Sequence, residues 1–496
     1  MPNNSIFLIV IIAYFTFLIL WGLYQGRKVK NAGDYAIAGR KLPGWVAALS
    51  ERATGESSWA LLGLPGAAYA TGVMEIWTAV GCVAGIVTSW AVLSWRLRKE
   101  SEKYQVSSFV DYLSKKHGDY AKPMRITASI TIVFVFFFYV AAQFLGGGKS
   151  LNIMFDISPV LGMLITVAII LPYTLYGGLQ SVAYTDVVQA LLMIVTLILG
   201  PILGWIYIHE HPGLFADGIG HALHKASAID QNVKTSVFGG LKGLAAGAAI
   251  ATGFSWFFGY LGGQPQLSMR FMAIRDDVQA RRARNIGIIW TVVAYLGALS
   301  MGWIGIAIFG PGGLSDPELV MPSVILTVFP PVIAAVLITG AIAAMVSTAD
   351  SLLILSSTEF SENILKLFTK KTMSAKKNLL ISRLITACLA VIACVVAYII
   401  YLLKADNIFN LVGYVWAFIG CPYSVVVLLS LFWKKYHGKA AVCTIIGGML
   451  FTIIWIATGL DSILTSRVVT FFASLIFALG FTYALKKPEQ KAEESV

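Results

Sequence analysis

Charged residues are scarce in this chain. Asp, Glu, Lys and Arg make up 12% of its 496 residues, whereas 57% are hydrophobic. A soluble protein has about twice that charged share, and a mean hydropathy of +0.77 over this length cannot be hidden in one soluble core. The apolar residues fall in runs of about 20, the length at which a helix crosses a bilayer. Backbone groups in lipid must be paired within the segment, and the short alternating segments of a β-barrel are missing. We therefore predict an all-α integral membrane protein embedded in a lipid bilayer.

Cysteine and histidine are also few, with five Cys and six His. The cysteines lie in apolar runs without metal-ligand spacing, and the histidines form no cluster. Nucleophile-elbow, HExxH and paired-cysteine motifs are missing as well, so the sequence predicts no catalytic residues and no enzyme. The net charge of +12 would suggest a nucleic-acid partner for a soluble protein. In a membrane protein the cytoplasmic loops collect Lys and Arg, so no nucleic-acid partner is expected.

The apolar runs place about thirteen spans in the chain. They lie near residues 5–25, 43–71, 74–95, 126–147, 158–177, 182–208, 238–264, 286–310, 323–365, 380–403, 408–433, 440–459 and 463–485. The first run lacks a basic leader and a cleavage site, so we expect a span and not a signal peptide. With the N-terminus outside, the great majority of the 37 Lys and Arg fall on the inner side. The positive-inside rule then predicts an outer N-terminus, a cytoplasmic C-terminus and a multi-pass protein of the cell inner (plasma) membrane. No stretch between the spans resembles a soluble domain, so residues 1–496 are predicted to form a single transmembrane domain.

Polar residues interrupt the second predicted span. Residues 50–59, Ser-Glu-Arg-Ala-Thr-Gly-Glu-Ser-Ser-Trp, carry three charges and several hydroxyl groups, and Pro65-Gly66 follows. One interpretation is an unwound helix whose free carbonyls bind a cation and whose half-helix end holds a solute. The other is that residues 41–56 are cytoplasmic and the span starts near Ser57. Composition alone leaves the two interpretations about even.

The seventh span is rich in glycine and ends in Gly262-Gly263-Gln264-Pro265, which stops a helix. Trp256 and Tyr260 lie one turn apart and share a face, which suits a small organic solute. Aromatic packing or an interfacial belt would also explain this pair, and close helix packing would explain the glycines.

The ninth span carries hydroxyl groups and a carboxylate, in Ser347, Thr348, Asp350 and Ser351. Oxygen ligands suit a hard cation such as sodium. Serines also bond back to their own helix, which would account for the hydroxyl groups but not for Asp350. Asp186 opens the sixth span, where it either caps that helix or completes an ion site.

These interruptions resemble, in this order, those of the sodium:solute symporter family, and most of all its sodium/proline symporter branch. The matching stretches are spread along nearly the whole chain: Gly39–Leu42, Trp59 with Gly63–Gly66, Thr185–Gln189, Gly263–Pro265 with Arg270–Ala273, Ala344–Thr348 and Trp416–Phe418. The resemblance favours placing Ala53 to Glu56 within the membrane. It implies thirteen spans with a core of two inverted five-helix repeats of the LeuT type. In this chain the repeats would lie approximately at 43–208 and 238–433, with peripheral spans at 5–25, 440–459 and 463–485.

The resemblance also implies the binding residues. The family's common sodium site would use Ala53, Glu56, Ala344, Ser347 and Thr348. A second sodium site, present in some members, would use Asp186, Ser347, Asp350 and Ser351. The solute positions would be Ser57, Trp59, Tyr139, Trp256 and Tyr260.

The chain departs from the branch at three places. Gly55 replaces the usual aspartate while Glu56 follows it, Tyr260 lies five and not four residues before Pro265, and Glu51 and Arg52 replace small residues. A buried arginine must be paired. Arg52 is therefore expected either in a gate or ion network with a protein carboxylate, which we favour, or on the carboxylate of the solute.

The implied function is sodium-coupled symport, with Na+ as the only metal required. The imported small-molecule solute would be proline or a related amino acid, carried by alternating access. The alternatives are symport of another small organic solute, such as an organic acid, a sugar acid or another amino acid, or a transporter-like membrane sensor. A sensor usually carries an appended signalling domain, and the stretch after Leu485 is too short for one.

Overall fold

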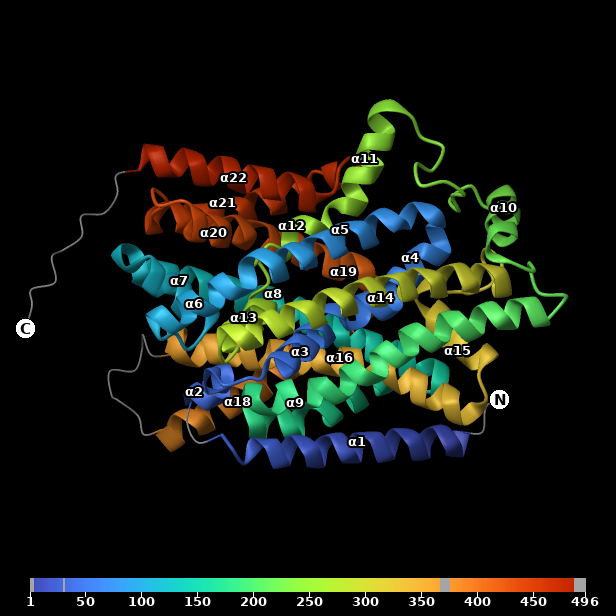
Figure 1. The fold of residues 1–496 in the computed structure, drawn as a ribbon, viewed down its shortest axis with the longest axis horizontal. Coiled ribbons are helices and arrows are strands. Elements are labelled where there is room, and N and C mark those ends of the chain that lie inside the picture. Colours follow the sequence, from blue (N-terminus) through green and yellow to red (C-terminus); the bar gives the residue numbers. More distant parts are fainter. Residues whose placement is uncertain (1–3, 30–31, 366–374, 486–496) are drawn as a thin grey trace, which may run out of the picture.

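The computed structural model describes residues 4–29, 32–365 and 375–485, and these residues are almost entirely helical. Figure 1 shows the long helices lying side by side along one direction. The first residues of α1 (Asn4–Gly26) and the last residues of α22 (Ser466–Ala484) lie at opposite ends of the bundle. The prediction of an all-α fold is confirmed.

Between these two helices the chain forms a bundle of continuous and interrupted helices. In chain order the main elements are α2 (Ala32–Ile37), α3 (Gly44–Ser58), η2 (Trp59–Gly63), α4 (Leu64–Thr71), α5 (Ile76–Thr88), η4 (Ser89–Leu93), α6 (Ser94–Tyr104), α7 (Phe109–Lys116), α8 (Ala121–Phe155), α9 (Pro159–Glu210), α10 (Ile219–Ile229), α11 (Gly243–Phe254), α12 (Trp256–Tyr260), α13 (Pro265–Ala273), α14 (Asp277–Phe309), η6 (Pro317–Leu319), α15 (Val320–Val328), α16 (Pro331–Glu359), η7 (Phe360–Leu365), α18 (Ala375–Leu402), α19 (Ile408–Val415), η8 (Trp416–Gly420), α20 (Cys421–Phe432) and α21 (Gly438–Ala457).

Ten helices of the described residues are long and apolar enough to cross a membrane, or eleven when the bent pair 243–260 and 265–273 counts as one span. This number is below the thirteen predicted for two physical reasons. Helix α9 contains 52 residues, which would extend about 78 Å if straight, more than twice the hydrocarbon thickness. It is interrupted at Gly178 (φ 55°, ψ −159°) and so covers two predicted spans. The predicted second span, α3 to α4, is too polar to count as apolar, because it contains several Ser, Thr and Gly residues as well as Glu51, Arg52 and Glu56.

Several predicted span boundaries differ from the helix ends in the structure. The seventh span begins at Gly243 and not at residue 238, and it continues after its break to Ala273. The long ninth range, 323–365, does not form one helix, because Pro330 and Pro331 separate α15 from α16 and Pro331 opens α16. Proline lacks the amide hydrogen that a continuous helix requires, and it is well placed at the start of the next one.

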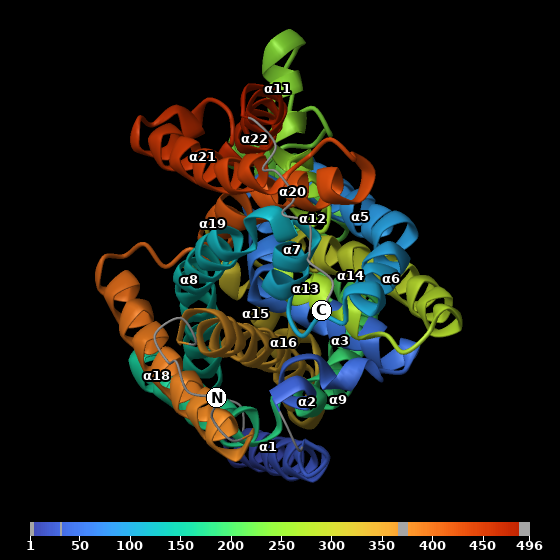
Figure 2. The same ribbon diagram turned by 90° about the vertical axis from the view of Figure 1, so that its left-hand side faces the viewer.

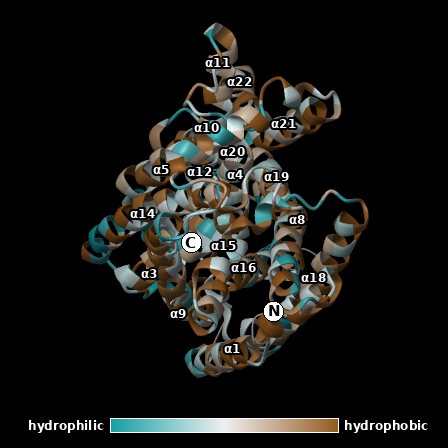
Figure 3. Ribbon diagram, turned by 90° about the vertical axis from the view of Figure 1, so that its right-hand side faces the viewer, coloured by the Kyte–Doolittle hydropathy of each residue, from teal (hydrophilic) through white to brown (hydrophobic). Residues whose placement is uncertain are grey.

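Burial divides the bundle into a centre and a rim. In the most apolar 18-residue stretch of the 331–365 segment, 83% of the residues are buried inside the protein. The corresponding share in α1 is 28%. Figure 2 shows α3, α13, α14 and α16 in the middle, with α1, α18, α21 and α22 outside them. The outer helices α18 and α21 are mostly hydrophobic in Figure 3, as lipid-facing surfaces must be. Polar groups of α3 and α16 therefore lie deep inside protein.

Ion pairs tie segments together at both ends of the bundle. At the end where α1 begins, Lys149 of α8 contacts Glu318 at 2.7 Å and Asp316 at 2.8 Å. At the other end, Arg98 of α6 contacts Asp277 of α14 at 2.6 Å.

His117, which follows α7, lies at the end of the bundle where Arg98 is found. Its ring lies 2.8 Å from the Ser430 hydroxyl group. Burial, with a smaller effect from the neighbouring Lys116 and His437, lowers the pKa of His117 from 6.5 to about 4. His117 is therefore a neutral packing residue near pH 7.

Candidate ion and solute sites

The break in the second predicted span lies at Ser57. This residue has φ 46° and ψ −164°, far from helical values, whereas the residues before and after it are helical. The Ser58 amide, which in an unbroken helix would donate to the Thr54 carbonyl, instead donates to Gln143 of α8 at 3.0 Å. All of residues 50–58 are buried inside the protein.

Two hydroxyl groups of α16 meet the carbonyl groups next to this break. Ser347 Oγ donates to the Ala53 carbonyl at 3.0 Å and to the Ala344 carbonyl at 2.9 Å. Thr348 Oγ1 lies 2.9 Å from the Thr54 carbonyl and 3.0 Å from the Ala344 carbonyl. The structure thus brings together four of the five residues expected at the common sodium site, all contributing oxygen atoms of the kind that hard cations prefer.

Glu56, the fifth residue, is held differently. Its carbonyl group accepts the Trp59 amide. Its carboxylate accepts the indole N–H of Trp290 at 2.6 Å, while Oε2 has no hydrogen-bond partner among the described residues. Its contacts therefore direct the side chain towards α14 and away from the hydroxyl groups of α16.

Two of the four residues expected at the second cation site, Asp186 and Ser351, contact a buried arginine, Arg270. Asp186 of α9 accepts hydrogen bonds at Oδ2 from Ser50 Oγ at 2.5 Å and from Arg270 Nη2 at 3.2 Å. The same Nη2 atom lies 2.5 Å from Ser351 Oγ and 3.0 Å from Thr54 Oγ1. Arg270 is 1% exposed. The sequence placed it only in a stretch that resembles the family, and its position in the centre of this cluster was not predicted.

Asp350 lies at the edge of this cluster. Its Oδ2 accepts the Tyr173 hydroxyl group at 2.7 Å, and its Oδ1 lies 3.3 Å from Ser351 Oγ. Ser347, the fourth expected member, makes its hydrogen bonds to Ala53 and Ala344 and so belongs to the first cluster.

Aromatic rings fill the space beside the break, on η2, α8 and α12. Trp59 and Trp256 stack with their ring centroids 4.3 Å apart and an angle of 10° between the planes. Tyr139 places its hydroxyl group 3.4 Å from Ser57 Oγ. The Tyr260 hydroxyl group lies 3.1 Å from that of Tyr295. All five residues expected at the solute site are therefore near one another.

Trp416 of η8 joins this cluster and was not predicted as a site residue. Its ring centroid lies 5.4 Å from that of Tyr260, 5.5 Å from Trp256 and 5.7 Å from Tyr139. The sequence carried a signal, because Trp416 belongs to a stretch that resembles the family. Gly259 makes the approach possible, since a Cβ atom there would lie 2.3 Å from Trp416 Cδ1. The shifted spacing of Tyr260 has therefore not removed it from the aromatic cluster.

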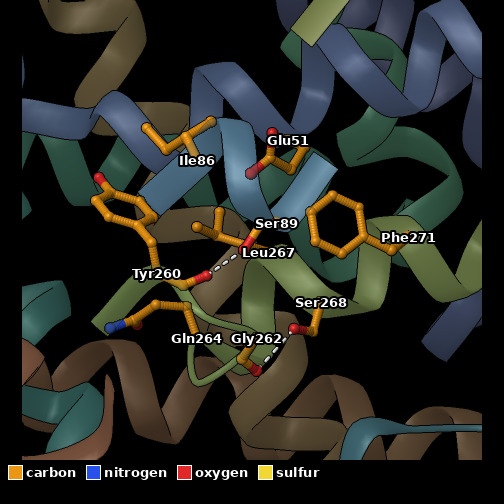
Figure 4. A pocket seen from close by; sticks show the side chains of 9 residues that line it. All are labelled: Glu51, Ile86, Ser89, Tyr260, Gly262, Gln264, Leu267, Ser268 and Phe271. Atoms are coloured by element: carbon orange, nitrogen blue, oxygen red, sulfur yellow. Dashed lines mark hydrogen bonds between the residues drawn. The ribbon is translucent and has the colours of Figure 1, made fainter. Parts of the chain in front are cut away.

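A small pocket lies next to the break between α12 and α13. Figure 4 shows Tyr260, Gly262 and Gln264 on one side of it, with Glu51 and Ser89 on the other. The Ser268 hydroxyl group donates to the Gly262 carbonyl at 2.9 Å, so a side chain again replaces a lost helical hydrogen bond. Helix breaks in the membrane require such replacements.

Arg52 pairs with its neighbour in the chain, Glu51. Arg52 Nε lies 2.6 Å from Glu51 Oε2, and Nη2 contacts the other carboxylate oxygen. The indole N–H of Trp90 also donates to Glu51, at 3.0 Å. Among the partners considered from the sequence, the structure thus gives Arg52 a protein carboxylate.

The amino-acid sequence places the chain in a known family of transporters. The sodium:solute symporter family matches residues 35–448. The chain belongs to this family. It is therefore a transporter and not an enzyme, and the expectation of sodium-coupled symport across a membrane is confirmed.

Bacterial relatives and solved structures agree with this assignment. The chain is 33% identical to the high-affinity proline transporter PutP of Bacillus subtilis, over 95% of this chain and 97% of that protein. It is 31% identical to the osmoregulated proline transporter OpuE of the same organism, over 90% of this chain and 88% of that protein. The solved structure of a Na+-coupled sialic acid symporter superimposes with a TM-score of 0.79, at 18% identity over 98% of this chain and 99% of that one. Mhp1, a nucleobase-cation-symport-1 family transporter, gives a TM-score of 0.52 at 11% identity over 90% and 92%.

The structural similarities show the fold alone, a multi-pass membrane protein with a LeuT-type core. Because the chain belongs to the sodium:solute symporter family, it is a sodium-coupled solute symporter, and Na+ is a transported cosubstrate.

Proposed function

We propose that this symporter imports proline or a closely related amino acid by alternating access. The observation that carries the proposal is the aromatic cluster around the break at Ser57, together with two relatives that are named as proline transporters. Proline is small, partly apolar and zwitterionic. Flat aromatic faces suit its ring, and a broken helix supplies polar backbone groups for its charges.

The sodium ion is proposed to bind between α3 and α16. Its ligands would be the carbonyl oxygens of Ala53, Glu56 and Ala344 and the hydroxyl oxygens of Ser347 and Thr348. The distances of 2.9–3.0 Å between the hydroxyl oxygens and the neighbouring carbonyl oxygens support this choice. An ion between them would accept oxygen lone pairs that the hydroxyl hydrogens now satisfy. Sodium would then hold α3 to α16 and order the nearby solute site.

The solute is proposed to contact five residues on η2, α3, α8 and α12: Ser57, Trp59, Tyr139, Trp256 and Tyr260. Trp59 and Trp256 stack directly on each other in this structure. Entry of a solute ring between them requires the two indoles to separate. Loss of one stacked pair costs about 0.5–1.5 kcal/mol, which contact with the solute ring would offset.

We further propose the membrane orientation, with the N-terminus outside and the C-terminus in the cytoplasm. The described ends of α1 and α22 lie at opposite ends of the bundle, which supports an odd number of crossings. The inverted repeats would span 43–208 and 238–433, with α1, α21 and α22 at the rim.

Uptake by proteoliposomes tests the proposed solute. Labelled proline, other amino acids, organic acids and sugar acids should be compared with and without an inward sodium gradient. Sodium-dependent accumulation of proline, reduced by an excess of unlabelled proline, is the expected result. If another solute accumulates and proline neither competes nor enters, the proline assignment is wrong. A chain that transports no solute while binding one would instead favour the sensor.

A further inference from the structure

We infer that the guanidinium group of Arg270 takes the place of a second cation, so that the protein carries one Na+ for each solute. This inference depends on the proposed function only for the identity of the transported ion. It concerns the cluster of Asp186, Ser50, Thr54 and Ser351, which lies beside the proposed sodium site. None of these four residues is a proposed ligand of the sodium ion.

The oxygen atoms of this cluster converge on one nitrogen atom. Arg270 Nη2 lies within 3.2 Å of a carboxylate oxygen and of two hydroxyl oxygens, each from a different helix: α9, α3 and α16. The other guanidinium nitrogens are also engaged. Nε donates to Ser50 Oγ at 3.1 Å and Nη1 donates to the Gln266 carbonyl at 2.9 Å. Carboxylate and hydroxyl oxygens gathered around one point form a ligand set for a hard cation.

The pairing with Asp186 is not the arrangement that an arginine and a carboxylate form by preference. Such a pair commonly makes two parallel hydrogen bonds. Here only Oδ2 of Asp186 is engaged, and Oδ1 is buried without a partner among the residues that the structure describes. One positive charge therefore sits among oxygens from several helices, as a bound ion would, and part of the carboxylate remains available.

Arginine keeps its charge under all ordinary conditions, so this tethered cation is permanent. A sodium ion could enter the cluster only if the guanidinium left, and an unpaired buried arginine would be strongly unfavourable. The guanidinium group of Arg270 thus neutralises the charge of Asp186, and no second sodium ion has to enter the cell to do so. Each coupled charge contributes roughly 50-fold to accumulation per 100 mV, so carrying one ion in place of two trades steepness for economy of ions.

Thr54 connects the tethered cation to the proposed sodium site. Its carbonyl group accepts the Thr348 hydroxyl group, and its own hydroxyl group contacts Arg270. Sodium and Arg270 would therefore act on the same residue of α3, one through the backbone and the other through the side chain. Two positive charges already share this region, which further disfavours a third.

Equilibrium binding of radioactive sodium to the purified full-length protein, without solute, tests the inference. The parent protein should bind one ion, and Arg270→Gln should bind one more, because the oxygen cluster is then free. Arg270→Lys should bind the same number as the parent. The double variant Arg270→Gln/Asp186→Asn should lose the additional ion. Arg98→Gln is a matched control, since Arg98 pairs with Asp277 away from the cluster and its removal should leave the number unchanged.

The difference between Arg270→Gln and the parent is the decisive quantity. Failure of the proposed sodium site would give zero and one ions in place of one and two, and would leave the inference standing. Two ions bound to the parent, or no additional ion in a monodisperse Arg270→Gln, would overturn it. If Arg270→Gln does not fold, the ratio of charge to solute measured from reversal potentials of the parent decides. A ratio of one net sodium charge per solute supports a tethered cation, and a ratio of two refutes it.

Discussion

Thr348 provides the sharpest test of the proposed sodium site. Its hydroxyl group lies 2.9 Å from the Thr54 carbonyl and 3.0 Å from the Ala344 carbonyl, so it joins α16 to the broken part of α3. Thr348→Ala removes this oxygen and leaves the rest of the helix in place. In the proposed site, the substitution removes one of five ligands.

The size of the effect follows from the charge of the ion. A hydrogen bond or similar contact to a charged group is worth about 1.5–3 kcal/mol. Since about 1.4 kcal/mol corresponds to a tenfold change in affinity, the sodium concentration for half-maximal uptake should rise about 10- to 100-fold. Thr348→Ser keeps the oxygen and should change this concentration by less than about threefold.

The assay is initial uptake of labelled solute as a function of sodium concentration, normalised to the amount of protein in the membrane. Thr339→Ala is a matched control on the same helix. Its hydroxyl group is buried and donates to the Ala335 carbonyl of the same helix at 2.7 Å. It should affect abundance as Thr348→Ala does, while leaving the sodium dependence unchanged. An unaltered sodium dependence in both Thr348→Ala and Ser347→Ala would refute the site.

Four further substitutions test separate parts of the structure. Trp256→Ala should raise the half-saturating solute concentration about 2- to 12-fold by removing an aromatic stack, with little change in apparent sodium affinity; a shift in sodium affinity alone would contradict this. Arg52→Lys loses the planar fork that holds Glu51 and should lower the solute accumulated per sodium gradient, whereas a changed solute preference would make Arg52 a substrate residue. Lys149→Met leaves Glu318 buried without its partner and should lower the thermal stability in detergent measurably, which an unchanged melting temperature would disprove. Because the pKa of His117 is lowered from 6.5 to about 4, the unfolded chain binds the additional proton between those pH values; stability should therefore fall as pH decreases through this range, and His117→Gln should weaken that dependence.

The sequence predicted the polar centre of the protein well, because its polar residues contradict the surrounding lipid pattern. Ser347 and Thr348 could be placed near Ala53 from the resemblance, and the structure brings these residues together. The aromatic residues Trp59 and Trp256 were also assigned to one site, where they now stack. Such residues are costly at membrane depth unless they are paired, so their presence in an apolar run is itself informative.

The position of Arg270 could not be predicted by the same reasoning. It follows the helix break at Gln264–Pro265, and a cation at the end of a span is ordinarily assigned to a loop. The structure continues the helix as α13 and turns it inward, so that Arg270 is buried beside Asp186. Sequence periodicity contains no information about this turn, because the direction of the chain after a break depends on tertiary packing. The number of spans differed for a related reason, since α9 bends at Gly178 without a loop.

The break at Ser57 connects the local backbone to the transport cycle. In an intact helix the Ala53 and Thr54 carbonyl groups would be paired within α3, and the helix could move as one unit. Here hydroxyl groups of α16 satisfy them. If α16 moves away from α3, these two carbonyl groups lose their hydrogen-bond partners. Because each buried unpaired group costs about 1–3 kcal/mol of stability, either water or an ion must replace the hydroxyl groups. We therefore expect separation of α3 from α16 to require hydration of this region, so that an occupied sodium site opposes separation and ion release accompanies it.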